Sequence, residues 1–480
     1  MRYFLPPLAL GLSLTAAAGA SALALHPDNP HYFLFRGKPA LILTSGEHYG
    51  AVLNLDFDYL KYLDTLKGDG LNGTRTWSGA YCEPPDAFNI ASNTLAPLKG
   101  RFICPWARSE QAGYLNGGNK FDLNQWDPAY FKRLKDFVKQ AGKRGIVVEL
   151  NLFCPFYEEG MWRLSPMNAV NNVNNVGSIA RTNVYTLDKS GGLLAVQESM
   201  VRKLVTELKG FDNLYYEICN EPYFGGVTLE WQRHIADVIT PAELKSGVRH
   251  LISQNIANEK ALVQNPHPQV SIFNFHYATP PETVALNYGL NKVVGDNETG
   301  FRGTNDAPYR MEAWDFLVAG GGLFNNLDYS FTSGHEDGSY IFPASQPGGG
   351  TAQLRRQFQF LSQTLRRLDF VHMHPDSSLA KADLPSGATL RVLANPGAVY
   401  LLYLRTGIGR AKDAPEPKTH CDTGEISIEL ALPQGKFSAQ WLNPKTCCPL
   451  ELSRFAHSVG THTFAVPAFA DDIALLVRAE

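Results

Sequence analysis

The stretch that decides the fold is Leu214-Tyr215-Tyr216-Glu217-Ile218-Cys219-Asn220-Glu221-Pro222. Its first six residues are apolar or aromatic except for Glu217, which is typical of a strand buried on both faces of a parallel sheet. Pro222 cannot donate a backbone hydrogen bond and restricts Glu221 to extended geometry, so the strand is expected to end with a carboxylate at its tip. In a (β/α)₈ barrel that tip is where catalytic groups lie.

Strand and helix patterns alternate on both sides of this stretch, which favours a parallel α/β architecture. Strands are predicted at residues 40–44, 72–77, 146–153, 214–219, 251–256, 270–276, 292–297 and 322–327. Long helices are predicted at residues 57–67, 128–144, 193–210 and 355–368. Residues 31–39 read as a short hairpin that covers the bottom of the barrel, and residues 79–127 as a long loop. We therefore predict a (β/α)₈ TIM barrel over residues 25–372.

The pattern of apolar and polar residues changes after the last predicted helix. Short alternating segments separated by Pro and Gly follow, and strands are predicted at residues 389–393, 398–404, 426–431, 436–441, 461–466 and 473–477. This pattern predicts a small antiparallel β-sandwich domain over residues 375–480 that supports the barrel.

Composition and an N-terminal apolar run indicate the class of protein and its compartment. The chain has 480 residues, of which 44% are hydrophobic and 19% charged, and a net charge of −3, so it gives no support for nucleic acid or an anionic membrane as partner. Arg2 precedes an apolar run at residues 4–25 that contains Ala18-Gly19-Ala20. Such a run predicts a signal peptide over residues 1–20 and a secreted or periplasmic protein, free of the membrane after cleavage. The alternative is an uncleaved N-terminal anchor.

Seven cysteines after an export signal permit disulfides without requiring them. Cys154 and Cys219 end predicted strands and are expected to be free and buried. The candidate pairs are Cys82 with Cys104, and Cys421 with either Cys447 or Cys448. No Cys or His cluster has the spacing of a zinc site, so no metal is expected.

A second carboxylate ends the seventh predicted strand, in Val293-Val294-Gly295-Asp296-Asn297-Glu298-Thr299-Gly300. A retaining glycosidase needs two carboxylates roughly 5–5.5 Å apart, one to attack the anomeric carbon and one to protonate the leaving oxygen. Glu221 and Glu298 end the fourth and seventh strands, which face each other across a barrel mouth. Asp296 shares the strand parity of Glu298, but it lies deeper, where the barrel interior is packed.

The segment Tyr-Glu-Ile-x-Asn-Glu-Pro, with Glu298 on the seventh strand and Arg75 ending the second, resembles the clan A retaining glycoside hydrolases. It is most similar to glycoside hydrolase family 5, the cellulase family. The resemblance implies that Glu221 is the acid/base and Glu298 the nucleophile. It also implies that Arg75 lies beside the nucleophile, where a cation favours the ionised carboxylate, and that Asn220 binds the sugar 2-hydroxyl.

Phe273-Asn274-Phe275-His276-Tyr277 on the sixth strand resembles the His-Tyr element of the same family. The resemblance implies that Tyr277 donates to Glu298 and that His276 contacts the acid/base or the sugar, although a buried His-Tyr pair is also common in cores. Glu217 matches a buried strand carboxylate of the family and is expected to be structural.

Two places depart from the family pattern. The family usually has a Trp at the end of the eighth strand, whereas this chain has Leu323-Phe324-Asn325-Asn326-Leu327-Asp328-Tyr329-Ser330, so Trp77 or Tyr329 is the candidate sugar platform. Glu47 and His48, after the first strand, have no counterpart in the family. They are candidates for contacts with sugar hydroxyls, and the alternative is a surface loop pair.

The sequence therefore predicts a secreted retaining glycoside hydrolase that cleaves β-glycosidic bonds of a poly- or oligosaccharide without a cofactor. One alternative is a non-catalytic carbohydrate-binding barrel, which needs aromatic residues rather than a carboxylate pair. Another is a metal-dependent barrel hydrolase that uses His372 and His374. Those two residues follow the last strand, whereas metal-binding histidines of barrels lie at strand ends, which favours a linker.

Overall fold

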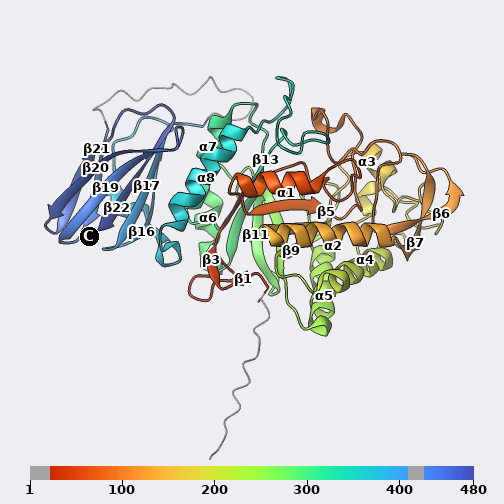
Figure 1. Cartoon of the computed structure of the whole chain (residues 1–480). Coiled ribbons are helices and arrows are strands. Elements are labelled where there is room, and N and C mark those ends of the chain that lie inside the picture. The colour runs from red at the N-terminus through yellow and green to blue at the C-terminus, as the bar shows by residue number, and fades with distance from the viewer. Residues whose placement is uncertain (1–21, 409–425) are drawn as a thin grey trace, which may run out of the picture.

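The computed structural model describes residues 22–408 and 426–480, and its centre is a nearly closed barrel of eight parallel strands (Figure 1). Neighbouring strands follow the order β4-β13-β12-β11-β10-β9-β8-β5. Their bounds are Ile42–Gly46 (β4), Gly73–Trp77 (β5), Val147–Phe153 (β8), Leu214–Cys219 (β9), Leu251–Asn258 (β10), Val270–His276 (β11), Val293–Thr299 (β12) and Leu323–Leu327 (β13). All eight predicted strands are confirmed, because runs buried on both faces have a clear apolar signal.

Side chains complete the seam between β4 and β5. The Asn72 amide donates to Leu41 O at 2.8 Å and accepts from Leu43 N at 3.0 Å. The Thr44 hydroxyl donates to Gly73 O at 2.6 Å. Gly73 allows this approach, because a Cβ there would lie 2.6 Å from Ile42 Cγ2. The first two barrel strands are therefore held together largely by polar side chains.

Helices pack around the barrel, and their ends follow the expected signals. In α2, the Asp127 carboxylate caps the N-terminus by accepting from Ala129 N and Tyr130 N, and Pro128 occupies the first helical position. The helices are α1 (Tyr59–Gly68), α2 (Pro128–Lys143), α3 (Glu159–Leu164), α4 (Leu193–Leu208), α5 (Leu229–Ser246), α6 (Glu282–Asn287), α7 (Asp306–Val318) and α8 (Ala352–Arg366). Short 3₁₀ turns lie at Ala87–Asn89, Arg181–Asn183, Tyr288–Leu290, Phe370–His372 and Ser377–Leu379.

A three-stranded sheet closes the bottom of the barrel, as predicted. It consists of β1 (Ala24–Leu25), β2 (Phe33–Phe35) and β3 (Lys38–Ala40). Leu23 and Phe33 share one apolar cluster with residues at the N-terminal ends of barrel strands, namely Ile42, Val147, Tyr215, Ile272, Val293 and Leu323. The opposite, carboxyl-terminal end of the barrel is left for the site.

The prediction of an irregular loop at residues 79–127 is wrong in its second half. That part contains a hairpin of β6 (Trp106–Ala112) and β7 (Asn119–Trp126). Most residues of β6 are partly or fully exposed, so no apolar alternation marks the strand in the sequence. The Arg108 guanidinium lies 3.9 Å above the Phe121 ring and packs one strand against the other.

The C-terminal part forms the predicted antiparallel sheets. One sheet has the order β14-β16-β17-β22-β19-β20 and the other β15-β18-β21, and a shared apolar core that includes Leu402, Ile428 and Leu475 lies between them. Their bounds are His374–Pro375 (β14), Ala380–Lys381 (β15), Thr389–Asn395 (β16), Val399–Arg405 (β17), Ser427–Leu432 (β18), Gly435–Asn443 (β19), Cys448–His457 (β20), Gly460–Ala465 (β21) and Asp472–Ala479 (β22). The sequence missed β20, whose side chains are almost all exposed.

Buried ion pairs fix the sandwich against α7. Arg310 on α7 lies 3.0 Å from Asp471 and 2.8 Å from Asp472. Asp315 on α7 accepts from Arg391 at 2.8 Å and from Arg405 at 2.7 Å. Separating the two parts would leave these buried charges unpaired, which is costly, so the sandwich has a defined position relative to the barrel.

Some predictions concern residues outside those described. The signal peptide at residues 1–20 and the pairing of Cys421 are among them. Cys154 and Cys219 are free and buried, as predicted, whereas Cys82 and Cys104 are also free, so the candidate disulfide between them does not form. Within residues 22–408 and 426–480, no helix combines the length and apolar character needed to cross a membrane.

Candidate active site

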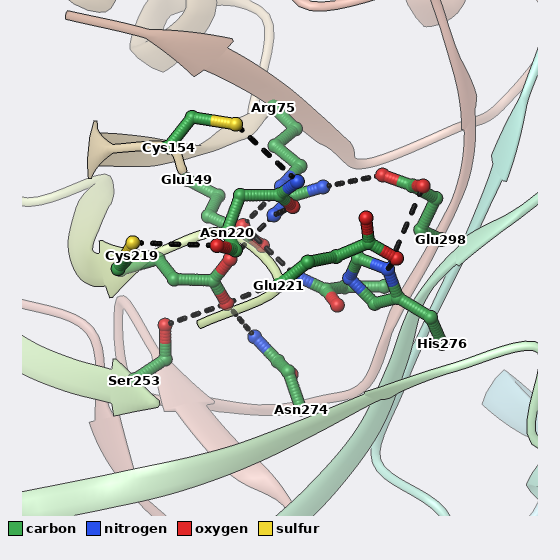
Figure 2. A network of polar contacts seen from close by, with 12 residues as sticks. Arg75, Glu149, Cys154, Cys219, Asn220, Glu221, Ser253, Asn274, His276 and Glu298 are labelled. Atoms are coloured by element: carbon green, nitrogen blue, oxygen red, sulfur yellow. Dashed lines mark hydrogen bonds and ion pairs between the residues drawn. The ribbon is translucent and has the colours of Figure 1, made fainter. Parts of the chain in front are cut away.

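Glu221 and Glu298 meet at the carboxyl-terminal mouth of the barrel, with His276 between them (Figure 2). One oxygen of each carboxylate and one ring nitrogen of His276 all lie within 4.8 Å of one another. All three side chains are at least nine-tenths buried. The two glutamates therefore have the short separation that the sequence led us to expect.

Three donors hold the Glu298 carboxylate. Oε2 accepts from the Tyr49 hydroxyl at 2.9 Å and from Arg75 Nη1 at 3.0 Å, and Oε1 accepts from the Tyr277 hydroxyl at 2.7 Å. A carboxylate bound in this way has a fixed orientation, and its negative charge is compensated by a guanidinium. The Arg75 and Tyr277 contacts are those that the family resemblance implied.

Arg75 joins the nucleophile candidate to a buried network beneath it. It donates to Glu149 Oε1 at 2.5 Å, to Asn220 Oδ1 at 2.7 Å, and to Glu217. Burial, together with the negative charge of Glu217, raises the pKa of Glu149 to about 7. Asn297 and Asn274 donate further hydrogen bonds to these carboxylates. One guanidinium thus orients three acidic side chains below the mouth of the barrel.

We expect Arg75→Met to lower the free energy of unfolding by about 3–5 kcal/mol, because it leaves buried carboxylates without their cation. Urea denaturation at pH 7 measures the change. The matched control is Arg101→Met, since Arg101 pairs with Asp56 at 2.6 Å and its side chain is 47% exposed. The control is expected to cost less than about 1 kcal/mol. Equal costs for the two variants would contradict this account of the network.

The environment of Glu221 differs from that of Glu298. Its carboxylate accepts from the Tyr157 hydroxyl at 2.6 Å and the Tyr223 hydroxyl at 3.2 Å, and His276 Nδ1 lies 3.1 Å from Oε1. Burial alone would raise the pKa of Glu221, but the hydrogen bond and charge of His276 outweigh burial and lower it. Burial likewise opposes the charge on His276, but the negative charges of Glu298 and Glu221 raise its pKa. Both directions favour an ion pair between Glu221 and His276.

The backbone at the site is strained. Glu221, Tyr277 and Tyr49 have φ angles of 33°, 55° and 63°, which are unusual for residues with a side chain. The expectation that Pro222 keeps Glu221 extended is therefore wrong. Each such residue costs about 1–3 kcal/mol and persists because its surroundings hold it, and here each side chain is fixed by hydrogen bonds.

Because of a β-bulge in β12, the prediction that Asp296 and Glu298 point to the same side of the strand is wrong. Phe275 pairs with Asp296, but the next residue, His276, pairs with Glu298, so one residue of β12 is unpaired. The bulge breaks the alternation of side chains. Asp296 accepts from Ala278 N at 3.1 Å, and burial followed by the charge of Glu312 on α7 raises its pKa. The side chains of Asp296 and Glu298 therefore do not share one direction. Asp296 is not a second carboxylate of the barrel interior.

A cleft of about 1160 Å³ lies above the two glutamates. Four of the eight predicted substrate-binding residues line it, namely His48, Trp77, Asn220 and Tyr277. Tyr329 is buried and stacks on His48, with ring centroids 5.9 Å apart. Glu47 is not brought into the cleft: its oxygens accept from Gly50 N, Ala51 N and the Thr94 hydroxyl, and burial raises its pKa to about 7. Trp77, rather than Tyr329, therefore offers a ring to the cleft.

Sequence reasoning missed several residues of the site. Tyr49, Tyr157 and Tyr223 all donate to the two glutamates, Glu149 binds Arg75, and Glu83 pairs with His48 at 3.3 Å. A signal was present for the tyrosines, because each follows the end of a predicted strand by a few residues. Their direction depends on loop backbone that the sequence pattern does not specify.

Hydrogen-bond donors already occupy the carboxylate oxygens that a metal ion would need as ligands. Within the described residues, Glu221, His276 and Glu298 form the one acidic or histidine group compact enough for a cation. The carboxylate oxygens already accept from five hydroxyl or guanidinium donors, and Arg75 places a positive charge 3.0 Å from Glu298. His372 pairs with Asp369 in an exposed turn after α8, away from this group.

A (β/α)₈ barrel with two facing glutamates at its carboxyl-terminal mouth defines the class of the clan A glycoside hydrolases. The family model described as Cellulase (glycosyl hydrolase family 5) matches residues 101–280, which include Glu221. By this match the chain is most similar to glycoside hydrolase family 5, the cellulase family, and it is a glycosidase that acts on a carbohydrate. A comparison with curated proteins found no match.

Solved structures support the fold. A putative glycoside hydrolase from Bacteroides vulgatus has a TM-score of 0.64 at 13% identity, over 96% of this chain and 83% of that chain. A glycoside hydrolase family 5 protein from the same organism has a TM-score of 0.62 at 14% identity, over 95% and 93%. A family 5 mannosidase from Rhizomucor miehei has a TM-score of 0.50 at 12% identity, over 73% and 99%.

Proposed function

We propose that the protein is a retaining glycosidase that cleaves β-glycosidic bonds by double displacement. The observation that carries the proposal is the separation of Glu221 and Glu298, whose nearest oxygens lie within 4.8 Å. Retaining enzymes hold their carboxyl groups about 5–5.5 Å apart, whereas inverting enzymes need about 6.5–9.5 Å to admit a water molecule. The distance therefore supports direct attack by one carboxylate.

In the first step, Glu298 attacks the anomeric carbon and Glu221 protonates the departing oxygen. Tyr49, Tyr277 and Arg75 hold Glu298 in one orientation, which suits a nucleophile. Glu221 needs a proton, and His276 supplies it along the 3.1 Å contact between Nδ1 and Oε1. The bond from Glu298 to the sugar removes a negative charge from the site.

In the second step, a water molecule cleaves the glycosyl–enzyme bond. Glu221 has given its proton to the leaving group and now acts as the base that deprotonates the water. The contacts from Tyr157 and Tyr223 stabilise the carboxylate form that this step needs. Asn220, which accepts from Arg75 at 2.7 Å, lies in the cleft where it can contact the sugar bound to Glu298.

The substrate in this proposal is a poly- or oligosaccharide, and the enzyme is exported. The cleft is long enough to extend from β4 and β5 to the C-terminal sheets, which supports a chain of sugars rather than a single one. The apolar run with Ala18-Gly19-Ala20 supports export to the periplasm or the medium. N-terminal sequencing of protein from the exported fraction checks cleavage near residue 20.

The test is hydrolysis of 4-nitrophenyl α- and β-glycosides of glucose, mannose and xylose, with NMR detection of the first product anomer. We expect turnover of at least one β-glycoside, a β-configured first product, and rates unchanged by EDTA. An α-configured first product would overturn the retaining mechanism. Sugar binding without turnover of any glycoside or polysaccharide would favour a binding protein, and loss of activity in EDTA would favour metal-dependent hydrolysis.

A further inference from the structure

The C-terminal sheets contribute directly to the catalytic cleft. Five residues at the start of β16 and the end of β17 line the same cleft as Glu221 and Glu298: Gly387, Thr389, Arg405, Gly407 and Ile408. A domain that only supported the barrel would pack against its helices and leave the cleft to the barrel loops. Figure 1 shows β16 and β17 beside α7 and α8, at the flank of the barrel.

This part of the cleft wall is continuous with the barrel. Arg405 is buried and donates to Asp315 of α7 at 2.7 Å and to Thr406 O at 3.0 Å. One turn earlier on α7, Glu312 binds Arg302, which follows β12 and also lines the cleft. The wall is therefore held by buried ion pairs, and its residues keep a fixed distance from the glutamates.

The arrangement of the catalytic pair indicates which part of a substrate meets this wall. The acid/base candidate Glu221 is contacted by Tyr223, whose hydroxyl also binds Asn258 at the end of β10. Glu298 is contacted by Tyr49 and Arg75 at β4 and β5, and by Tyr277 directly after β11. Because the acid protonates the departing oxygen, the leaving group lies on the β10 side.

The cleft on that side leads to the sandwich. Its lining continues from Asn258 and Lys260 after β10, through Thr279 and Glu282 after β11, to Arg302 after β12 and the five sandwich residues. Lys260 pairs with Glu282, Arg302 with Glu312 and Arg405 with Asp315, so these cations are compensated. Such a wall offers hydrogen-bonding groups, which suit sugar hydroxyls.

We propose that the start of β16 and the end of β17 form a leaving-group subsite, in which the C-terminal sandwich binds a sugar beyond the scissile bond. This inference rests on the proposed glycosidase function. It assigns the sandwich a role in the choice of the bond that is cleaved, and it predicts that oligosaccharides with several sugars on the leaving-group side are bound better than aryl glycosides.

Gly407 is the position at which to block this subsite. A Cβ built there meets nothing closer than Gly387 O at 3.5 Å, an ordinary contact, and its φ lies outside the positive range. Because Gly407 lines the cleft and tolerates a Cβ, Gly407→Trp introduces a large ring at the cleft wall. The matched control is Glu429→Trp, which adds the same ring at an exposed position of β18 in the same sandwich.

The experiment uses cellohexaose and mannohexaose labelled at the reducing end, and it measures which bond is cleaved. For the hexasaccharide that the wild type hydrolyses faster, we expect Gly407→Trp to lower kcat/KM by about tenfold, the effect of losing roughly 1.4 kcal/mol of binding. Cleavage should shift toward the reducing end, so that fewer sugars occupy the blocked side. Rates on 4-nitrophenyl β-glycosides, which place no sugar beyond the scissile bond, should fall by a smaller factor than rates on the hexasaccharide. Glu429→Trp should change neither the rates nor the positions of cleavage.

Three results would overturn the inference. An unchanged cleavage pattern in Gly407→Trp means that the sandwich does not contact the leaving group. A shift toward the non-reducing end places the sandwich on the other side of the scissile bond. An equal loss on aryl glycosides and hexasaccharides indicates general damage to the site. Failure of the wild type to hydrolyse any glycoside would instead refute the proposed function, so the two claims fail in different ways.

Discussion

Glu298→Ala is expected to lower kcat on a 4-nitrophenyl β-glycoside by about 10⁵-fold, the largest effect of any single change in this chain. The alanine removes the group that forms the glycosyl–enzyme bond, and the other donors in the site cannot replace it. Arg75 keeps its contacts with Glu149 and Glu217, so the variant should fold. Release of 4-nitrophenol measures the rate, and thermal unfolding checks the fold.

The same strand provides the control for this prediction. Asp296 lies two residues earlier and is fully buried, and burial raises its pKa, so the neutral amide of Asp296→Asn suits the same buried position. We expect Asp296→Asn to retain activity within about tenfold. If instead the Asn variant is inactive and Glu298→Ala is active, the nucleophile has been assigned to the wrong residue.

Azide gives a second readout for Glu298→Ala. An azide ion that occupies the space of the missing carboxylate attacks from the same face of the sugar, in a single displacement. The product should therefore be the α-glycosyl azide, with inverted configuration. A β-glycosyl azide from this variant would contradict the role of Glu298 as the nucleophile.

The barrel could be predicted because its strands have a strong local signal. Each barrel strand is buried on both faces, so it appears as a short apolar run between turn residues. The hairpin of β6 and β7 and the strand β20 lack this signal, since most of their side chains face solvent. Periodicity of apolar residues reports burial, so exposed strands are the elements that it misses.

The candidate site was predictable only where it lies at strand ends. Glu221 and Glu298 could be placed because parallel strands bring their carboxyl ends together at the barrel mouth. The bulge after Asp296 and the positive φ of Tyr49 could not be foreseen, because both arise from contacts between distant parts of the chain. The contribution of Arg405 to the cleft depends on how the sandwich packs against α7, which no local pattern encodes.

Glu221→Ala is expected to act on the two chemical steps to different extents. With a poor leaving group, such as a sugar, kcat/KM should fall by about 10³–10⁴-fold, because the departing oxygen is no longer protonated. With 2,4-dinitrophenyl β-glycosides, which leave without protonation, the first step should be nearly unaffected. The second step still lacks its base, so the glycosyl–enzyme should accumulate and produce a burst of dinitrophenol.

Azide tests whether Glu221→Ala loses activity because a catalytic group is missing or because the fold is damaged. A small anion that enters the space vacated by the Glu221 side chain can attack the glycosyl–enzyme without a base, so azide should raise kcat on the activated substrate by about tenfold or more and give the β-glycosyl azide. Glu158→Ala, which removes an exposed glutamate next to Tyr157, should show neither the burst nor the rescue. Wild-type turnover of an unactivated glycoside by Glu221→Ala would show that another group protonates the leaving oxygen. In that case His276 would be the group to test next, because its Nδ1 lies 3.5 Å from Glu298 and 3.1 Å from Glu221 and the charges of both carboxylates raise its pKa.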